Sequence, residues 1–176
     1  MSNPEFEKTL ANLDEEFHKR YLQLAYEEAE KSAAEGEVPA GCVIVQLSED
    51  GLVSKLVGRA HNMTEGLKDP TAHAEVLAIT QAANAVGDWR LTNCILYVTK
   101  EPCPMCAGAI VLARLPLVVW GVSDPKRGGH TEFGIFDHPG INHHPEVIPG
   151  IMEEECLAQL QAFFKARRES KVQSVK

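Results

Sequence analysis

The sequence has no long hydrophobic run. None of its stretches approaches the roughly 20 consecutive apolar residues that a membrane-spanning helix needs. The first residues also lack the basic start and the apolar segment that are typical of a secretory signal peptide. We therefore expect a cytoplasmic protein with no membrane partner.

Positive charge is also scarce. Seventeen lysines and arginines face 25 aspartates and glutamates, which leaves a formal net charge of −8. Domains that bind nucleic acid over a broad surface are usually basic, so this balance argues against such a surface. A protein that holds one short RNA loop needs only a local basic patch. The candidates for that patch are Lys126, Arg127, Lys165, Arg167, Arg168 and Lys171.

The chain has five cysteines, an odd number, which argues against a disulfide framework. Two of them, Cys103 and Cys106, form a Cys-x-x-Cys pair, which favours a reduced compartment and metal binding. The other three have no metal-binding spacing and are predicted to be small buried apolar residues: Cys42, Cys94 and Cys156.

Length and composition indicate a single globular domain. The chain has 176 residues, of which 44% are hydrophobic and 24% charged, so it can bury a core of ordinary size. We expect a polar, unpatterned N-terminal arm over 1–13, which is either loosely held or disordered or an extension of the first helix. The domain itself is expected over 14–170, followed by a C-terminal tail over 171–176.

Hydrophobic periodicity predicts an alternation of helices and strands. Helices are expected over 14–35, 74–86 and 151–170, with a further helix that begins at the cysteine pair. Strands are expected over 38–47, 52–60, 95–100 and 117–122, and a short one over 146–150. Segment 48–51 is a turn, and 61–72 and 123–145 are loops. This order predicts an α/β protein, a three-layer sandwich of a sheet between helices.

The segment 101–108 carries half of a zinc site. Cys103 and Cys106 are three residues apart and share one helix face. Pro102 and Pro104 suit the start of a helix, where a missing N–H costs nothing. The positive end of the helix dipole favours thiolate over thiol, and thiolates are zinc ligands.

The segment 69–75 supplies a third ligand, His73, at the start of the next predicted helix. Two thiolates and one neutral imidazole leave a fourth position on zinc for water, which is the pattern of catalytic zinc. Glu75 is only two residues further on, so it does not share the direction of His73. It is therefore a candidate acid or base beside that water.

These residues carry a resemblance to a known family. His73-Ala74-Glu75 followed by Pro102-Cys103-x-x-Cys106 is similar to the signature of zinc-dependent nucleobase deaminases. From about Glu37 to Arg168 the chain resembles the bacterial tRNA-specific adenosine deaminases in particular. The matching elements include 37–39, 69–75, 89–91, 96–99, 101–110, 124–126, 142–143 and 163–168.

The resemblance implies a cytidine-deaminase-like three-layer α-β-α sandwich with a mixed central sheet, one Zn²⁺ per subunit and a homodimer. It also implies hydrolytic deamination of adenosine to inosine in RNA, at the wobble position of a tRNA anticodon loop, with Glu75 as the proton shuttle. The substrate contacts that it implies are Asn62, Ala74, Asp124 and Lys126. Glu101 is expected behind the zinc ligands, and RNA contacts are expected at Arg127, Arg167 and Arg168.

Two alternatives stay open. The negative charge and the departures from the family pattern at 63–68 and 130–134 motivate a deaminase of a free nucleobase such as guanine or cytosine. A zinc-stabilised binding module without activity is the other alternative, and it needs a fourth protein ligand. One of the histidines outside the motif would have to supply that ligand.

Overall fold

The computed structural model describes residues 4–48 and 54–173. Most of the turn expected at 48–51 and the first residues of the strand expected at 52–60 lie outside the described residues. The end of the tail, 174–176, lies outside them as well. Among the described helices, none is both long enough and apolar enough to cross a membrane.

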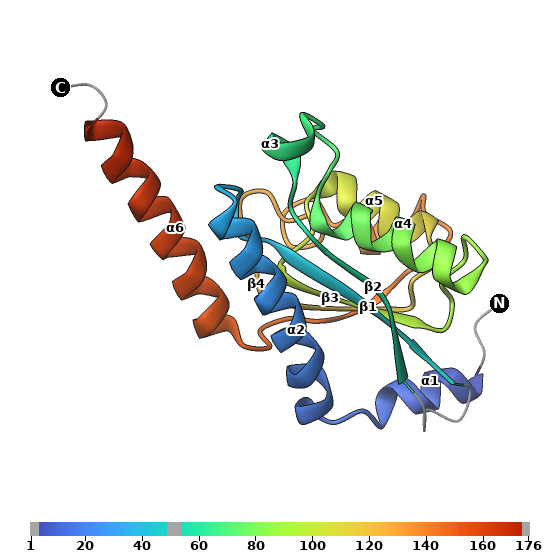
Figure 1. Ribbon diagram of the computed structural model, residues 1–176. Helices are drawn as coiled ribbons and strands as arrows, with labels where there is room; N and C mark the ends of the chain where they lie inside the picture. The colour runs from blue at the N-terminus through green and yellow to red at the C-terminus, as the bar shows by residue number, and fades with distance from the viewer. Residues whose placement is uncertain (1–3, 49–53, 174–176) are drawn as a thin grey trace.

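One mixed sheet forms the centre of the described fold (Figure 1). Its strands lie in the order β2-β1-β3-β4-β5. The first two pairings are antiparallel, and the pairings of β3 with β4 and of β4 with β5 are parallel. The strands are β1 (Gly41–Leu47), β2 (Ser54–His61), β3 (Cys94–Lys100), β4 (Leu117–Val122) and β5 (Glu146–Ile148). The predicted mixed central sheet is therefore confirmed.

Helices cover both faces of this sheet, as the three-layer prediction requires. Helices α4 (Ala74–Val86) and α5 (Pro104–Leu112) lie on one face (Figure 1). Helix α2 (Glu15–Ala34) lies on the other face and is joined there by the first turns of α6 (Glu153–Gln173). Beyond these turns α6 projects away from the sheet (Figure 1).

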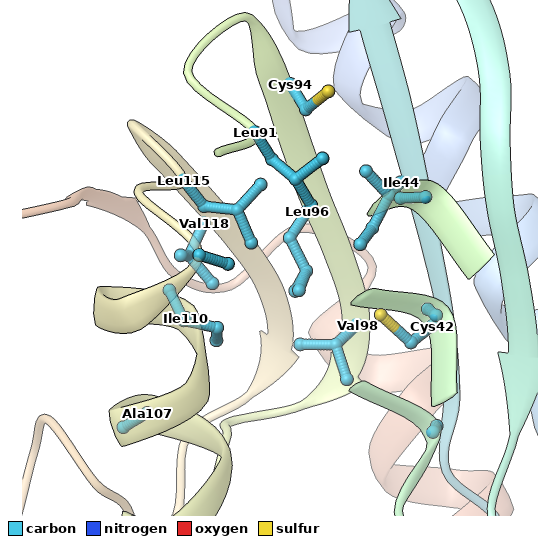
Figure 2. Close-up of a cluster of buried hydrophobic side chains, with 14 of the residues drawn as sticks. Cys42, Ile44, Leu91, Cys94, Leu96, Val98, Ala107, Ile110, Leu115 and Val118 are labelled. Atoms are coloured by element: carbon cyan, nitrogen blue, oxygen red, sulfur yellow. The ribbon is translucent and has the colours of Figure 1, made fainter. Parts of the chain in front are cut away.

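Strand alternation divides the core into two halves. Ile44, Leu96 and Val118 point to the α4–α5 face, where Figure 2 shows them packed with Ile110 of α5. The residues between them on each strand point to the α2 face and pack against that helix: Val43, Val45, Ile95, Tyr97, Leu117 and Val119. Because both of their faces are buried, β1, β3 and β4 are almost continuously apolar.

The three cysteines outside the pair are buried, as predicted. Cys42 and Cys94 lie in the core on the α4–α5 side (Figure 2), and Cys156 lies in the half that faces α2. All three are 0% exposed.

Three sequence expectations about helices were wrong. The N-terminal segment includes a helix, α1 (Pro4–Ala11), which buries Phe6 and Leu10 in the core and is not a loose arm. Loop 61–72 contains a one-turn helix, α3 (Thr64–Leu67), and loop 123–145 contains a 3-10 turn, η1 (Ile135–Asp137). Short helices of this kind depend on tertiary contacts, which the local pattern does not reveal.

Burial along α6 and at His18 follows packing rather than side-chain type. The apolar residues Leu157 and Phe164 of α6 are 38% and 41% exposed, while Cys156 and Leu160 are buried. His18 is polar and lies on a helix among charged residues, yet it is only 3% exposed. Its Nδ1 lies 3.0 Å from the Tyr97 hydroxyl, which satisfies the ring inside the core.

Candidate active site

His73 is held at the N-terminus of α4. It is the N-cap residue of that helix, with extended backbone angles, and its N–H donates to the Thr71 carbonyl at 2.7 Å. The carboxylate of Asp69 accepts from the N–H and the hydroxyl of Thr71, which closes the turn before the histidine. Asp69 thereby fixes the direction in which the chain enters α4.

The cysteine pair lies at the N-terminus of α5, directly after β3. Cys103 is the N-cap residue, and Pro104 follows at the first helical position, as the sequence predicted. The Cys103 carbonyl accepts from the Ala107 N–H at 2.8 Å, so the first turn of α5 is regular. Strands β2 and β3 are both antiparallel to β1 and so run in the same direction, which places their carboxyl ends, and with them the starts of α4 and α5, at the same end of the sheet.

The structure brings the three predicted ligands together. The Nδ1 atom of His73 lies 3.6 Å from the sulfur of Cys103 and 3.5 Å from that of Cys106. A tetrahedral zinc site with ordinary Zn–S and Zn–N bonds separates nitrogen from sulfur by about 3.6 Å. The donor set and its spacing therefore fit zinc.

The cluster has three members in the described part of the chain, since no further histidine, cysteine or carboxylate there joins it. Cys106 is buried, whereas His73 and Cys103 are only partly buried. Three protein ligands with one accessible side are typical of catalytic zinc, while a structural site has four. The histidines outside the motif do not close the cluster in this structure.

The two cysteines of the pair differ in acidity. Hydrogen bonding from Cys106, together with the hydrogen bond to His73, lowers the pKa of Cys103 to about 3. The neighbouring Cys103 thiolate and burial raise the pKa of Cys106. The hydrogen bond to Cys103 raises the pKa of His73. Of the two thiols, Cys103 is therefore the one whose surroundings favour the thiolate form that metal binding requires.

Glu75 lies in the first turn of α4 and is 5% exposed. Burial raises the pKa of its carboxyl group. A raised carboxyl pKa is typical of a group that transfers protons near neutral pH. Glu75 is not a member of the His73–Cys103–Cys106 cluster, in agreement with the sequence argument that it does not share the direction of His73.

Glu101 is 2% exposed, and its carboxylate is bound by a neighbouring loop. The carboxylate accepts from the N–H groups of Asp124, His130 and Thr131 and from the Thr131 hydroxyl, at 2.7 to 3.2 Å. These donors belong to the loop that follows β4. Glu101 therefore fixes the 124–131 loop beside α5, and its expected place behind the zinc ligands stays a prediction.

Asp124 begins this loop, and its carboxylate is already engaged. One oxygen accepts from the Lys100 ammonium, and the other accepts from the N–H groups of Lys126 and Arg127 at 3.0 Å. These bonds hold the pKa of Asp124 below its usual value although burial opposes the shift. The side chains of Lys126 and Arg127 are exposed.

Asn62 follows β2 and is 7% exposed. The next residue, Met63, donates its N–H to the Ala72 carbonyl at 3.0 Å, so this loop runs beside the residue that precedes His73. Ala74 is the first residue of α4 and is 0% exposed. Ala74 therefore lies directly after His73, and the chain that follows Asn62 runs beside the residue before His73; their contact with substrate stays a prediction.

Arg167 and Arg168 are not brought near the cluster. They are exposed on the part of α6 that projects from the sheet, and α6 lies on the face opposite α4 and α5 (Figure 1). Any contact that they make with a long substrate is therefore separate from the metal-binding cluster.

Sequence reasoning missed Glu37 as a site residue. Its carboxylate is 2% exposed and accepts from the side-chain amide of Asn62. The signal was present, because Glu37 lies in one of the motifs that carry the resemblance, but its partner is 25 residues away in the sequence.

A mixed sheet between helices, with one histidine and two cysteines at two adjoining helix N-termini, defines the class of cytidine-deaminase-like proteins. Comparison with known proteins identifies the family within this class. The family model of the MafB19-like deaminases matches residues 16–168. The chain therefore belongs to this deaminase family.

Two curated relatives are named tRNA-specific adenosine deaminase. The protein of Bacillus subtilis (strain 168) is 45% identical over 152 residues, which cover 86% of this chain and 91% of the relative. The protein of Haemophilus influenzae (strain Rd) is 41% identical over 162 residues, which cover 92% of this chain and 91% of the relative.

A solved structure is also similar to this chain. It comes from a study of A-to-I editing by deaminases that act at the wobble position of transfer RNA. It superimposes with a TM-score of 0.74 at 39% identity, covering 80% of this chain and 98% of the other.

Proposed function

We propose that the protein is a zinc-dependent deaminase that converts the wobble adenosine of a tRNA anticodon loop to inosine. The observation that carries this proposal is the cluster of His73, Cys103 and Cys106, in a chain 45% identical to a tRNA-specific adenosine deaminase. A single deaminase domain over 14–170 carries the activity, and we place the protein in the cytoplasm, where tRNA is modified.

One zinc ion per protomer is held by the His73 imidazole and the two cysteine thiolates. When bound, zinc supplies an activated water at neutral pH by lowering the pKa of that water to about 7. The chain needs no further protein ligand for this chemistry, since three ligands leave a position for water. The burial of Cys106 and the partial burial of the other two ligands leave one accessible side for the substrate.

Glu75 carries the protons. Hydrolytic deamination adds water at C6 of adenine and releases ammonia, so one proton of the water must move to the ring nitrogen N1, where it stays, and the other to the leaving amine. A buried carboxyl group with a raised pKa holds such a proton near neutral pH and also gives it up. Glu75 performs both transfers.

The base is held next to the cluster by Asn62 and by the Ala74 N–H at the start of α4. An N–H in the first turn of a helix has no partner within the helix and points toward a ligand. Asn62 contributes a side-chain amide that can donate and accept together. The Asp124 loop, fixed by Glu101, borders the site and exposes Lys126 and Arg127 toward phosphates.

The basic end of α6 provides a second, separate RNA contact. Arg167 and Arg168 are exposed there, and the guanidinium carbon of Arg167 lies 6.0 Å from the centre of the Phe163 ring. A local basic patch of this kind compensates for the net charge of −8.

We further propose a homodimer through α5. This helix contains no charged residue, and on its outer side Met105 is 37% and Leu112 is 70% exposed. Exposed apolar surface of this kind is typical of a protein–protein interface. Because the same helix begins with the cysteine pair, the partner protomer would lie close to the metal-binding cluster.

Inosine formation on an anticodon stem-loop with a wobble adenosine tests the proposed reaction. We expect zinc-loaded protein to produce inosine at that position, and Glu75→Ala to lose at least about 10²-fold in rate with its zinc retained. Guanine, adenine and cytosine are tested in parallel. Turnover of a free base with no inosine in the stem-loop would contradict the proposal in favour of a nucleobase deaminase.

A further inference from the structure

The carboxylate of Glu37 is buried and accepts two hydrogen bonds, one from Asn62 and one from Gly66. Its side chain belongs to a residue that is 2% exposed. One carboxylate oxygen accepts from the Gly66 N–H at 2.7 Å, and the other accepts from Nδ2 of Asn62 at 2.9 Å. Glu37 therefore connects the start of the 62–72 loop to the one-turn helix α3 within it.

These bonds determine which way the Asn62 amide faces. A backbone N–H can only donate, and a carboxylate can only accept, so the Asn62 NH₂ group must face Glu37. A second contact agrees with this orientation, since the Thr64 hydroxyl donates to Oδ1 of Asn62 at 3.1 Å. The backbone of Asn62 is also fixed, because its N–H donates to the Ala40 carbonyl at 2.9 Å.

The amide of Asn62 still has free capacity. Its NH₂ group can donate twice and its oxygen can accept twice, and one of each is used within the chain. One N–H and one oxygen lone pair remain. An asparagine amide with these two groups free is complementary to the N7 and N6 edge of adenine, where it donates to N7 and accepts from the N6 amine.

We propose that Glu37 is a positioning residue that sets the base specificity of the site by fixing the orientation of the Asn62 amide. This inference rests on the proposed function, since it requires that Asn62 contacts the adenine base. Glu37 does not touch the substrate itself. If the amide were reversed, its oxygen would face N7, and two acceptors would oppose each other.

Glu37→Gln tests this role, because glutamine has nearly the same shape as glutamate. The Gly66 N–H cannot reverse, so the glutamine oxygen must remain on that side and its NH₂ group must face Asn62. The Asn62 amide then has to flip. Glu35→Gln is the matched control, since this exposed carboxyl group lies two residues away and faces His61 instead.

The first readout compares adenosine with 7-deazaadenosine at the wobble position of the stem-loop. The analogue has a C–H in place of N7, so it lacks the acceptor whose bond to Asn62 the flip removes, while both substrates share the contact at the N6 amine. We expect the ratio of kcat/KM for adenosine over the analogue to fall about tenfold in Glu37→Gln. A tenfold change is the effect expected for the loss of one hydrogen bond. The intrinsic reactivity of the two bases is the same for both enzymes and cancels.

A double-mutant cycle shows whether Glu37 acts through Asn62. In an Asn62→Ala background, Glu37→Gln should leave the ratio unchanged, because no amide remains to be flipped. Equal effects of Glu37→Gln with and without Asn62 would overturn the proposal and leave Glu37 a structural residue. An unchanged ratio in the single variant would overturn it too.

The second readout does not depend on activity. The side-chain amide of Asn62 gives a pair of NMR signals that are assigned by their loss in Asn62→Ala. We expect Glu37→Gln to shift both signals and to speed their exchange with water, while Glu35→Gln leaves them in place. Inactive wild-type protein with the expected NMR change would refute the proposed function and the specificity role together. Active protein with unchanged signals would refute the Glu37 inference alone.

Discussion

Four glutamates of the described chain are almost fully buried, and their surroundings give them different roles. Glu37 and Glu101 accept N–H donors from loops beside the site. Burial tends to raise the pKa of Glu28, but hydrogen bonds from Lys31, Arg59 and His61 outweigh it and leave that pKa lowered. Glu75 has a raised pKa and lies beside the metal-binding cluster. Only Glu75 is therefore suited to exchange protons.

His18 should make folding stability depend on pH. Burial lowers the pKa of its imidazole, although Asp14 opposes the shift. The unfolded chain then binds a proton below its ordinary pKa of about 6.5 more readily than the folded chain does. His18 therefore stabilises the folded protein at a pH above this ordinary pKa. The contribution is lost as the pH falls toward the lower pKa of His18 in the folded protein.

Chemical denaturation of wild type and His18→Gln between pH 5 and pH 8 measures this effect. The difference in unfolding free energy between the two proteins should shrink as the pH falls, because glutamine does not titrate. The other histidines contribute equally to both proteins and cancel. A difference that is constant across this range would contradict the buried, neutral state of His18.

At the residue scale, the sequence predicted the metal ligands better than it predicted the hydrogen-bond partners of the buried glutamates. His73, Cys103 and Cys106 could be found because their spacing and their proline and helix context are local. The acceptors that organise the site could not, because Glu37 bonds to Asn62 and Gly66, and Glu101 bonds to residues 23 to 30 positions away. Such pairings become visible only when the sheet has brought the loops together.

Among the elements, α4 depends on close contact with the edge strand β2. A methyl group on Gly58 of β2 would lie 2.5 Å from the carbonyl oxygen of Ala78 in α4. Both atoms are fixed by backbone, so neither can give way without moving the helix that begins at His73. The glycine is required by this approach of helix and strand.

Gly58→Ala should therefore displace α4. We expect a loss of about 1–3 kcal/mol in unfolding free energy, as is usual for overpacking, and weaker zinc binding. Calorimetry and a competitive chelator titration measure the two effects. Lys55→Ala on the exposed part of the same strand is the control and should change stability by less than about 0.5 kcal/mol. Unchanged stability in Gly58→Ala would show that α4 does not pack as described.

The loop over 124–131 should lose its order when Glu101 is changed. Glu101→Gln replaces one acceptor oxygen with an NH₂ group that faces backbone donors. A hydrogen bond to a charged group contributes about 1.5–3 kcal/mol, so amide exchange in this loop should accelerate about tenfold or more. Hydrogen-exchange mass spectrometry measures the rate on peptides that span the loop.

Zinc content separates this account from the original expectation for Glu101. The described bonds of Glu101 go to the loop and not to His73, Cys103 or Cys106. We expect Glu101→Gln to keep one zinc per chain. Lost zinc with unchanged loop exchange would instead show that Glu101 supports the metal ligands.

At the scale of elements, long periodic segments were predicted and short ones were not. Helix α2 begins after Asp14 as expected, because the Asp14 carboxylate accepts from the Phe17 N–H at 2.8 Å. Helix α4 has the bounds predicted for it. Among the described side chains of α1, Phe6 and Leu10 mark its buried side, and α3 is a single turn that ends at Lys68 in the left-handed conformation.

For the whole molecule, the fold follows from a sheet that is apolar on both faces, and the order of its elements predicted the three layers. The dimer does not follow in the same way, because exposed apolar residues of α5 indicate an interface without fixing its geometry. The projection of α6 away from the sheet (Figure 1) was also not predictable. Its buried residues, Cys156 and Leu160, lie in its first half, while residues 161–170 are almost all exposed.

Leu112→Glu should separate the proposed dimer without unfolding the protomer. Leu112 is 70% exposed, so a charge there costs a lone protomer little, but it would be buried in an apolar interface. Light scattering after size exclusion should show a monomer with a nearly unchanged far-ultraviolet spectrum. Leu67→Glu, at a residue 53% exposed on α3, is the control and should remain dimeric. A dimer that survives Leu112→Glu would place the interface elsewhere.

The central claim is that one zinc ion, bound by His73, Cys103 and Cys106, supports deamination of a wobble adenosine in tRNA. The most direct measurement is the inosine content of a cognate tRNA as metal-free protein receives increasing equivalents of zinc. We predict that inosine forms at the wobble position only, and that the rate rises linearly and saturates at one zinc per chain. A fully zinc-loaded protein that leaves the wobble adenosine intact would contradict the account.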